Sequence, residues 1–94
     1  MPNSKAIKVR IIGQVQGVFF RVWVKEKADN LGVMGWIRNR LDGDVEGLFV
    51  GPEEAVDALV EVCREGPKPA LIDEIKIEPA QGVVPANFQI KPTV

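Results

Sequence analysis

The sequence predicts an α+β domain in which two helices cover one face of an antiparallel sheet. Apolar and polar residues alternate over residues 7–11, which is the period of a strand with one buried face. From Phe20 the apolar spacing changes to that of a helix. A hairpin, a second helix and a further strand follow, so the predicted order is β-α-β-β-α-β with a short fifth strand. This is the order of the split β-α-β, or ferredoxin-like, sandwich.

The first strand and the first helix are joined by a loop that directly follows a glycine. The strand ends at Gly13, and the loop occupies residues 14–19. The helix begins at Phe20 and carries apolar residues at helical intervals. It ends at Leu31-Gly32, because glycine readily adopts the left-handed conformation that closes a helix.

A hairpin follows the first helix. Residues 33–39 predict a strand, and Asp42-Gly43 predicts a tight turn, because glycine supplies the positive φ that such turns require. Residues 45–50 then return antiparallel to the first arm. Asn39 therefore lies on the first arm of the hairpin, close to its turn.

The second half of the chain repeats the pattern of a helix and a strand. Pro52 and the two acids after it open a second helix, because proline and negative charge suit the first helical turn. The helix ends at Gly66-Pro67. Residues 72–79 predict a fourth strand, and residues 88–90 predict a short last strand. We find no linker or repeat, so residues 1–94 form a single domain.

Composition indicates an ordinary globular protein. Of the 94 residues, 46% are hydrophobic and 27% are charged, and no stretch approaches the ~20 apolar residues of a membrane span. The formal net charge of −1 provides no attraction to nucleic acid or to anionic lipid. The N-terminal residues lack an export pattern. We expect a cytoplasmic monomer without nucleic-acid or membrane partners.

The absence of histidine restricts the chemistry. It excludes a phosphohistidine intermediate, a Ser-His or Cys-His pair and an imidazole-bound zinc. The single cysteine, Cys63, excludes a disulfide within the chain, and its place on the apolar stripe of the second helix predicts a buried small side chain. No spacing of metal ligands appears, so we expect no metal and no cofactor.

The loop before the first helix suits an anion. A helix start offers unpaired N–H groups and the positive end of the helix dipole. Gly17 permits backbone conformations that turn successive N–H groups toward one point. Arg21, in the first helical turn, adds a guanidinium fork that matches phosphate or carboxylate oxygens. The stretch therefore predicts a site for a phosphoryl group.

Simpler interpretations remain open for the individual residues. Arg21 alone is equally typical of a solvated helix face, and Asn39 alone is typical of turn chemistry. Arg38 and Arg40 are expected to be solvated strand residues, and Trp23 and Trp36 are expected to be core or half-buried packing residues.

Two motifs of the sequence resemble a known family. Residues 13–21, Gly-Gln-Val-Gln-Gly-Val-Phe-Phe-Arg, resemble the first motif of the acylphosphatase family, G-x-V-Q-G-V-x-[FY]-R. Residues 35–39 resemble the start of the second motif. That motif continues at the family's spacing with Gly43, Val45 and Gly51. One departure is Val24, where many members have threonine.

The resemblance implies an acylphosphate phosphohydrolase that releases a carboxylate and orthophosphate from a small-molecule substrate without a cofactor. It implies that Arg21 binds the phosphoryl oxygens and that Asn39 orients the attacking water. Backbone amides would cradle the phosphate, and these belong to Gln16, Gly17, Val18, Phe19 and Phe20.

The chemistry of the leaving group agrees with this expectation. Hydrolysis at phosphorus expels a carboxylate whose conjugate acid has a pKa of roughly 4, so no general acid is needed.

Two non-enzymatic alternatives share the fold. An RNA-recognition module would carry a basic and aromatic third strand, which residues 45–50 lack. A non-catalytic phosphate-binding module would retain the loop alone, whereas this chain has both Arg21 and Asn39.

Overall fold

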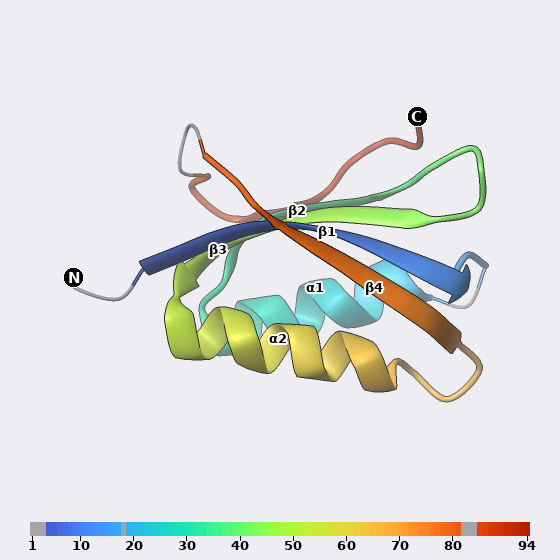
Figure 1. Cartoon of the computed structure of the whole chain (residues 1–94), viewed down its shortest axis with the longest axis horizontal. Helices are drawn as coiled ribbons and strands as arrows, with labels where there is room; N and C mark the ends of the chain where they lie inside the picture. The colour runs from blue at the N-terminus through green and yellow to red at the C-terminus, as the bar shows by residue number, and fades with distance from the viewer. Residues whose placement is uncertain (1–3, 18, 82–84) are drawn as a thin grey trace.

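The computed structural model describes residues 4–17, 19–81 and 85–94, and it consists of a sheet with two helices on one face (Figure 1). The predicted ferredoxin-like order of elements is confirmed. The elements are β1 (Ser4–Gln14), α1 (Phe20–Leu31), β2 (Met34–Asn39), β3 (Val45–Pro52), α2 (Glu53–Glu65), β4 (Leu71–Pro79) and β5 (Phe88–Ile90).

The five strands lie in the order β4-β1-β3-β2-β5. The expectation of a purely antiparallel sheet is wrong at the fifth strand, because β5 pairs parallel to β2 while the other pairs are antiparallel. The register explains this difference. Pro79 at the end of β4 lies opposite Ile7 near the start of β1, which is the end of the sheet where β2 also begins. A chain that leaves β4 there and enters β5 runs in the same direction as β2.

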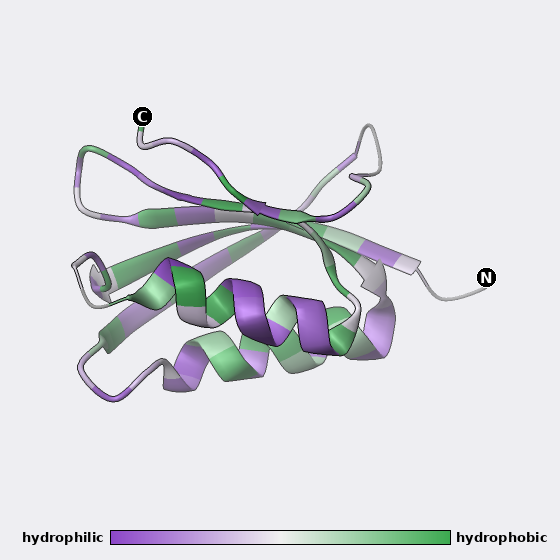
Figure 2. Ribbon diagram, turned by 180° about the vertical axis from the view of Figure 1, so that it is seen from behind, coloured by the Kyte–Doolittle hydropathy of each residue, from purple (hydrophilic) through white to green (hydrophobic). Residues whose placement is uncertain are grey.

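The hydrophobic core lies between the sheet and the helices. Alternating residues of β1 are buried. Figure 2 shows bands of hydrophobic and hydrophilic residues along the strands of the sheet. The largest fully buried side chains include Phe20 at the start of α1 and Phe49 in the middle of β3. Phe20 therefore anchors the beginning of α1 in the core, directly after the loop that the sequence singles out.

The helix boundaries follow from local chemistry. Gly32 adopts φ 77° and ψ 25° and closes α1, as predicted. Pro52 was expected in the first turn of α2, but it is the residue before that turn, because β3 extends through it. Cys63 is buried as predicted, and burial raises the pKa of its thiol to about 12. Within the described residues, no helix has the length and apolar character to cross a membrane.

Candidate active site

The loop between β1 and α1 adopts unusual backbone angles. Gly17 has φ 74°, and Phe19, the N-cap of α1, has φ 60° and ψ 23°. The N–H of Trp23 donates to the carbonyl of Phe19 at 3.0 Å, so the helical ladder starts with Trp23. The backbone amides of Phe20, Arg21 and Val22 therefore lie before the first hydrogen bond of the helix. Among the described residues, no side chain caps them. These amides form the positive end of α1.

A hollow of about 230 Å³ lies at this helix start. Arg21 contributes its charge, and within the described chain it forms no ion pair with a carboxylate. The sequence-predicted residues Gly17, Phe19 and Phe20 line the same hollow, and Val18 lies outside the described residues. Among the described residues, Val15 and Val22 also line it.

Asn39 is the last residue of β2 and is half-buried. Its side-chain oxygen Oδ1 is buried and has no hydrogen-bond partner among the described residues. An unpaired buried acceptor is costly, so its retention needs an explanation beyond packing. The backbone carbonyl of Asn39 accepts a hydrogen bond from the N–H of Val94 at 3.2 Å, which holds the residue in place.

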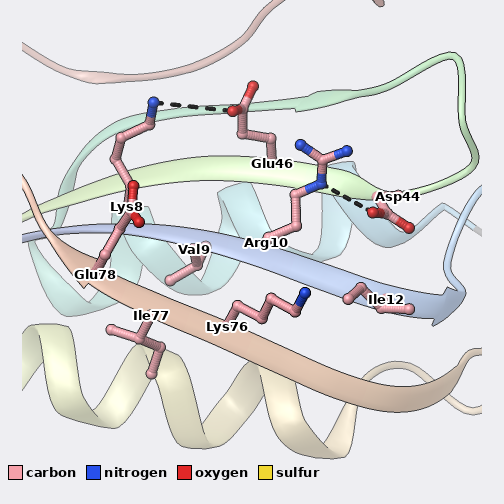
Figure 3. Close-up of a pocket in the computed structure, with 9 residues that line it drawn as sticks. All are labelled: Lys8, Val9, Arg10, Ile12, Asp44, Glu46, Lys76, Ile77 and Glu78. Carbon is pink, nitrogen blue, oxygen red and sulfur yellow. Dashed lines mark hydrogen bonds and ion pairs between the residues drawn. The ribbon is translucent and has the colours of Figure 1, made fainter.

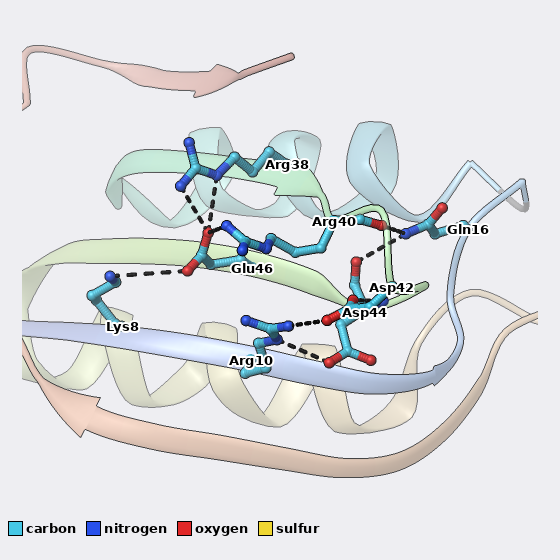
Figure 4. Close-up of polar contacts among 8 residues, drawn as sticks. All are labelled: Lys8, Arg10, Gln16, Arg38, Arg40, Asp42, Asp44 and Glu46. Atoms are coloured by element: carbon cyan, nitrogen blue, oxygen red, sulfur yellow. Dashed lines mark hydrogen bonds and ion pairs between the residues drawn. The ribbon is translucent and has the colours of Figure 1, made fainter. Parts of the chain in front are cut away.

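Gln16 connects the loop to the hairpin that carries Asn39. Its side-chain Nε2 donates to the carbonyl of Arg40 at 2.8 Å and to the carbonyl of Asp44 at 2.9 Å (Figure 4). Arg40 directly follows Asn39, so these two bonds fix the loop beside the end of β2. The sequence predicted only a backbone role for Gln16, because no pattern reveals which distant carbonyls a side chain will reach.

The hairpin turn is itself tied to the sheet. Arg10 on β1 donates from Nε to Oδ2 of Asp44 at 2.9 Å and also pairs with Asp42. The hydrogen bond to Asp44, with both carboxylates nearby, raises the pKa of Arg10. The N–H of Asp44, together with Arg10, lowers the pKa of Asp42. The turn that Gln16 contacts is therefore stabilised from both sides.

Two arginines of the hairpin do not behave as expected. Arg38 and Arg40, predicted to be solvated, both pair with the half-buried Glu46, at 2.9 and 3.3 Å. Arg38 lies directly opposite Glu46 in the register of β2 and β3, which the sequence alone does not specify. Burial opposes ionisation of Glu46, but the arginines and Lys8 outweigh it and lower its pKa. Arg38 also lies over Trp36, 4.6 Å from the ring centre.

A larger hollow of about 340 Å³ lies on the sheet among charged side chains (Figure 3). Lys8, Arg10 and Glu46, which line it, are partly exposed, and no sequence-predicted site residue contributes to its wall. Within the described part of the chain, no group of three or more Asp, Glu or Cys side chains gathers as metal ligands. Of the described sequence-predicted residues, Gly17, Phe19, Phe20 and Arg21 line the hollow at the start of α1, whereas Gln16 and Asn39 line neither hollow.

Comparisons with known proteins agree with the two motifs. The sequence profile of the acylphosphatase family matches residues 7–90. An acylphosphatase of Rhodospirillum rubrum is 47% identical over 90 residues, covering 96% of this chain and 99% of that protein. One from Rhizorhabdus wittichii is 43% identical over 93 residues, covering 99% of this chain and 94% of that protein.

Comparison of the fold with solved structures also indicates the acylphosphatase family. The solved structure of an acylphosphatase from Coxiella burnetii superposes with a TM-score of 0.90 at 35% identity, covering 95% of this chain and 94% of that chain. Sequence and structure agree over nearly the full length of chains of similar size. The chain therefore belongs to the acylphosphatase family of hydrolases.

Proposed function

We propose that the chain hydrolyses small-molecule acyl phosphates to a carboxylate and orthophosphate by attack of water at phosphorus, without a metal or cofactor. In this proposal Arg21 binds the phosphoryl group and Asn39 orients the water. The observation that carries it is the hollow at the start of α1, which combines Arg21 with amides that precede the helical ladder.

The phosphoryl group fits this combination of donors. Its oxygens accept hydrogen bonds from backbone amides of Gln16, Gly17, Phe19 and Phe20 in the proposed complex, and the sequence motif adds Val18. The guanidinium of Arg21 matches two of the oxygens bidentately and is free of carboxylate partners within the described residues. Donors fixed before the substrate arrives stabilise the charge that develops during phosphoryl transfer.

Asn39 supplies an acceptor for the water. Its buried Oδ1 lacks a partner among the described residues, so in the proposed complex it is the acceptor for the attacking water. An amide does not remove a proton at neutral pH, so we propose that a phosphoryl oxygen takes the proton from the attacking water. Gln16 keeps Asn39 and the phosphate loop in register.

The leaving group determines which phosphates react. A carboxylate departs unprotonated because its conjugate acid has a pKa of roughly 4. An alkoxide is far more basic and normally requires an acid or a metal, which the proposed residues do not supply. The proposed site therefore suits mixed anhydrides of carboxylic and phosphoric acid and suits simple phosphate esters poorly.

One experiment tests this selectivity directly. Purified protein is assayed with benzoyl phosphate and with p-nitrophenyl phosphate, each in the presence of EDTA. We expect turnover of benzoyl phosphate only, at a rate that EDTA leaves unchanged. Loss of activity in EDTA, or comparable hydrolysis of the ester, would refute the proposed mechanism.

Replacing Gln16 by methionine tests the connection between loop and hairpin. The change keeps the size of the side chain but removes its hydrogen bonds to the carbonyls of Arg40 and Asp44, which retain only their backbone donors. We expect the free energy of unfolding to fall by about 1–2 kcal/mol, or about 4–16 °C in Tm for a domain of this size. Thermal denaturation followed by circular dichroism measures this effect, and Gln89→Met on exposed β5 is the matched control. Equal Tm values for the two variants would show that the hydrogen bonds of the Gln16 side chain do not contribute to stability.

We also propose that the protein is a cytoplasmic monomer without a nucleic-acid partner. A single buried cysteine suits a reducing compartment, and the net charge of −1 gives no pull toward nucleic acid. Size-exclusion chromatography with light scattering checks the oligomeric state.

A further inference from the structure

Phe19 occupies a position that is costly for phenylalanine. Its backbone is left-handed, with φ 60° and ψ 23°, a region that glycine and asparagine enter far more readily. Its side chain is 84% exposed, so it gains little from burial in the core. As the N-cap of α1 it provides no side-chain cap, which serine, threonine, aspartate or asparagine would supply. Folding alone thus does not account for an aromatic residue here.

Val22 provides a second exposed apolar side chain one helical turn further on. It is 59% exposed and lies in the first turn of α1, three residues after Phe19. Both line the same hollow as Arg21. We name Phe19 and Val22 the apolar wall. The hollow therefore combines one cationic group with an apolar surface beside it.

We propose that the apolar wall binds the acyl group of the substrate, so that the enzyme selects acyl phosphates whose acyl group is apolar. This inference rests on the proposed function, in which Arg21 binds the phosphoryl end. The acyl carbon is joined to phosphorus through a single oxygen, so the acyl group lies within a few ångström of the bound phosphoryl group. Among the described residues that line the hollow, Phe19 and Val22 are the exposed large apolar side chains beside Arg21.

The apolar wall strengthens substrate binding because it removes apolar surface of the acyl group from water. The phenyl ring of Phe19 packs against aliphatic or aromatic acyl groups. An acetyl group is too small to use much of this surface, and a polar acyl group gains nothing from it. The apolar wall contacts the acyl group in the bound substrate and still contacts it while the bond to phosphorus breaks. The contact therefore stabilises both states about equally and is expressed mainly in KM.

Acetyl phosphate and hexanoyl phosphate provide the test. Their leaving groups are unbranched carboxylates of similar basicity, so a difference between them reports contact with the acyl chain. For the wild type we expect kcat/KM to be higher for hexanoyl phosphate by about 3- to 10-fold, the range that one apolar or aromatic contact contributes. In Phe19→Asn we expect this ratio to approach one, whereas Phe19→Leu retains most of it. Val22→Asn lowers the ratio less, because its side chain is smaller.

Two measurements separate this effect from misfolding. Asparagine accommodates the left-handed backbone, so Phe19→Asn is expected to keep or raise Tm. Leu71→Asn, on β4, removes a side chain that is also 59% exposed but does not line the hollow, and it should leave the ratio unchanged. The ratio is internal to each variant and does not depend on its absolute rate.

Several outcomes overturn the inference. A wild-type ratio near one, or a ratio that persists in both Phe19→Asn and Val22→Asn, shows that the wall does not contact the acyl group. A wild-type dimer that Phe19→Asn converts to a monomer would identify the wall as a surface for self-association. Failure of the wild type to hydrolyse either substrate would contradict the proposed function itself, which distinguishes the two proposals.

Discussion

Arg21→Ala is expected to lower kcat/KM for benzoyl phosphate by about 10³-fold or more, the scale on which an arginine acts when it stabilises a transferring phosphoryl group. The residue supplies the charge of the hollow at the start of α1. Its removal weakens ground-state binding and leaves the developing charge to the amides alone. Steady-state kinetics and competitive inhibition by inorganic phosphate measure both effects, and we expect both to deteriorate.

Arg21→Lys separates charge from geometry. Lysine keeps the positive charge but replaces a planar fork with a point charge, so we expect activity well below that of the wild type. Because Arg21 forms no ion pair within the described chain, neither variant leaves a carboxylate unpaired, and Tm should stay near that of the wild type. Full activity of Arg21→Lys would show that bidentate binding is unnecessary, and full activity of Arg21→Ala would remove the residue from the proposed site.

The sequence was sufficient for the fold because local signals and periodicity agree along the chain. Strand alternation, helical spacing and a glycine at position 32 each depend on neighbouring residues only, and the order of elements follows from them. The parallel pairing of β5 was missed, since it depends on which end of the sheet β4 reaches. Register between distant strands is not a local property.

The same limit applies to the site. Arg21 and Gly17 fall within one short motif, and the structure brings them to one hollow. The contacts of Gln16 with the hairpin and of Arg38 with Glu46 depend on strand register and side-chain reach. The left-handed backbone of Phe19 was also unexpected, because propensity argues against it for a bulky aromatic residue. Sequence reasoning identified the charged residue and the loop residues of the motif, and it missed the side-chain contacts and backbone angles that depend on the folded structure.

Asn39→Ala is expected to reduce kcat by about 10²–10³-fold, the cost of removing one preorganised polar group at a reacting centre. Inhibition by inorganic phosphate should change by less than about threefold, because the proposed phosphate donors remain in place. This split between turnover and binding distinguishes a residue that orients water from one that binds the phosphoryl group. Arg21→Ala, in contrast, should affect both.

The unpaired oxygen of Asn39 also makes a prediction about stability. Since Oδ1 has no partner among the described residues, Asn39→Ala deprives no described donor of its acceptor and relieves a buried unpaired polar atom. We therefore expect Tm to be unchanged or higher while kcat falls. Asn30→Ala, at an exposed position near the end of α1, is the matched control and should leave kcat unaltered. A large loss of Tm in Asn39→Ala would indicate a structural role instead, and normal hydrolysis by this variant would exclude Asn39 from the reaction.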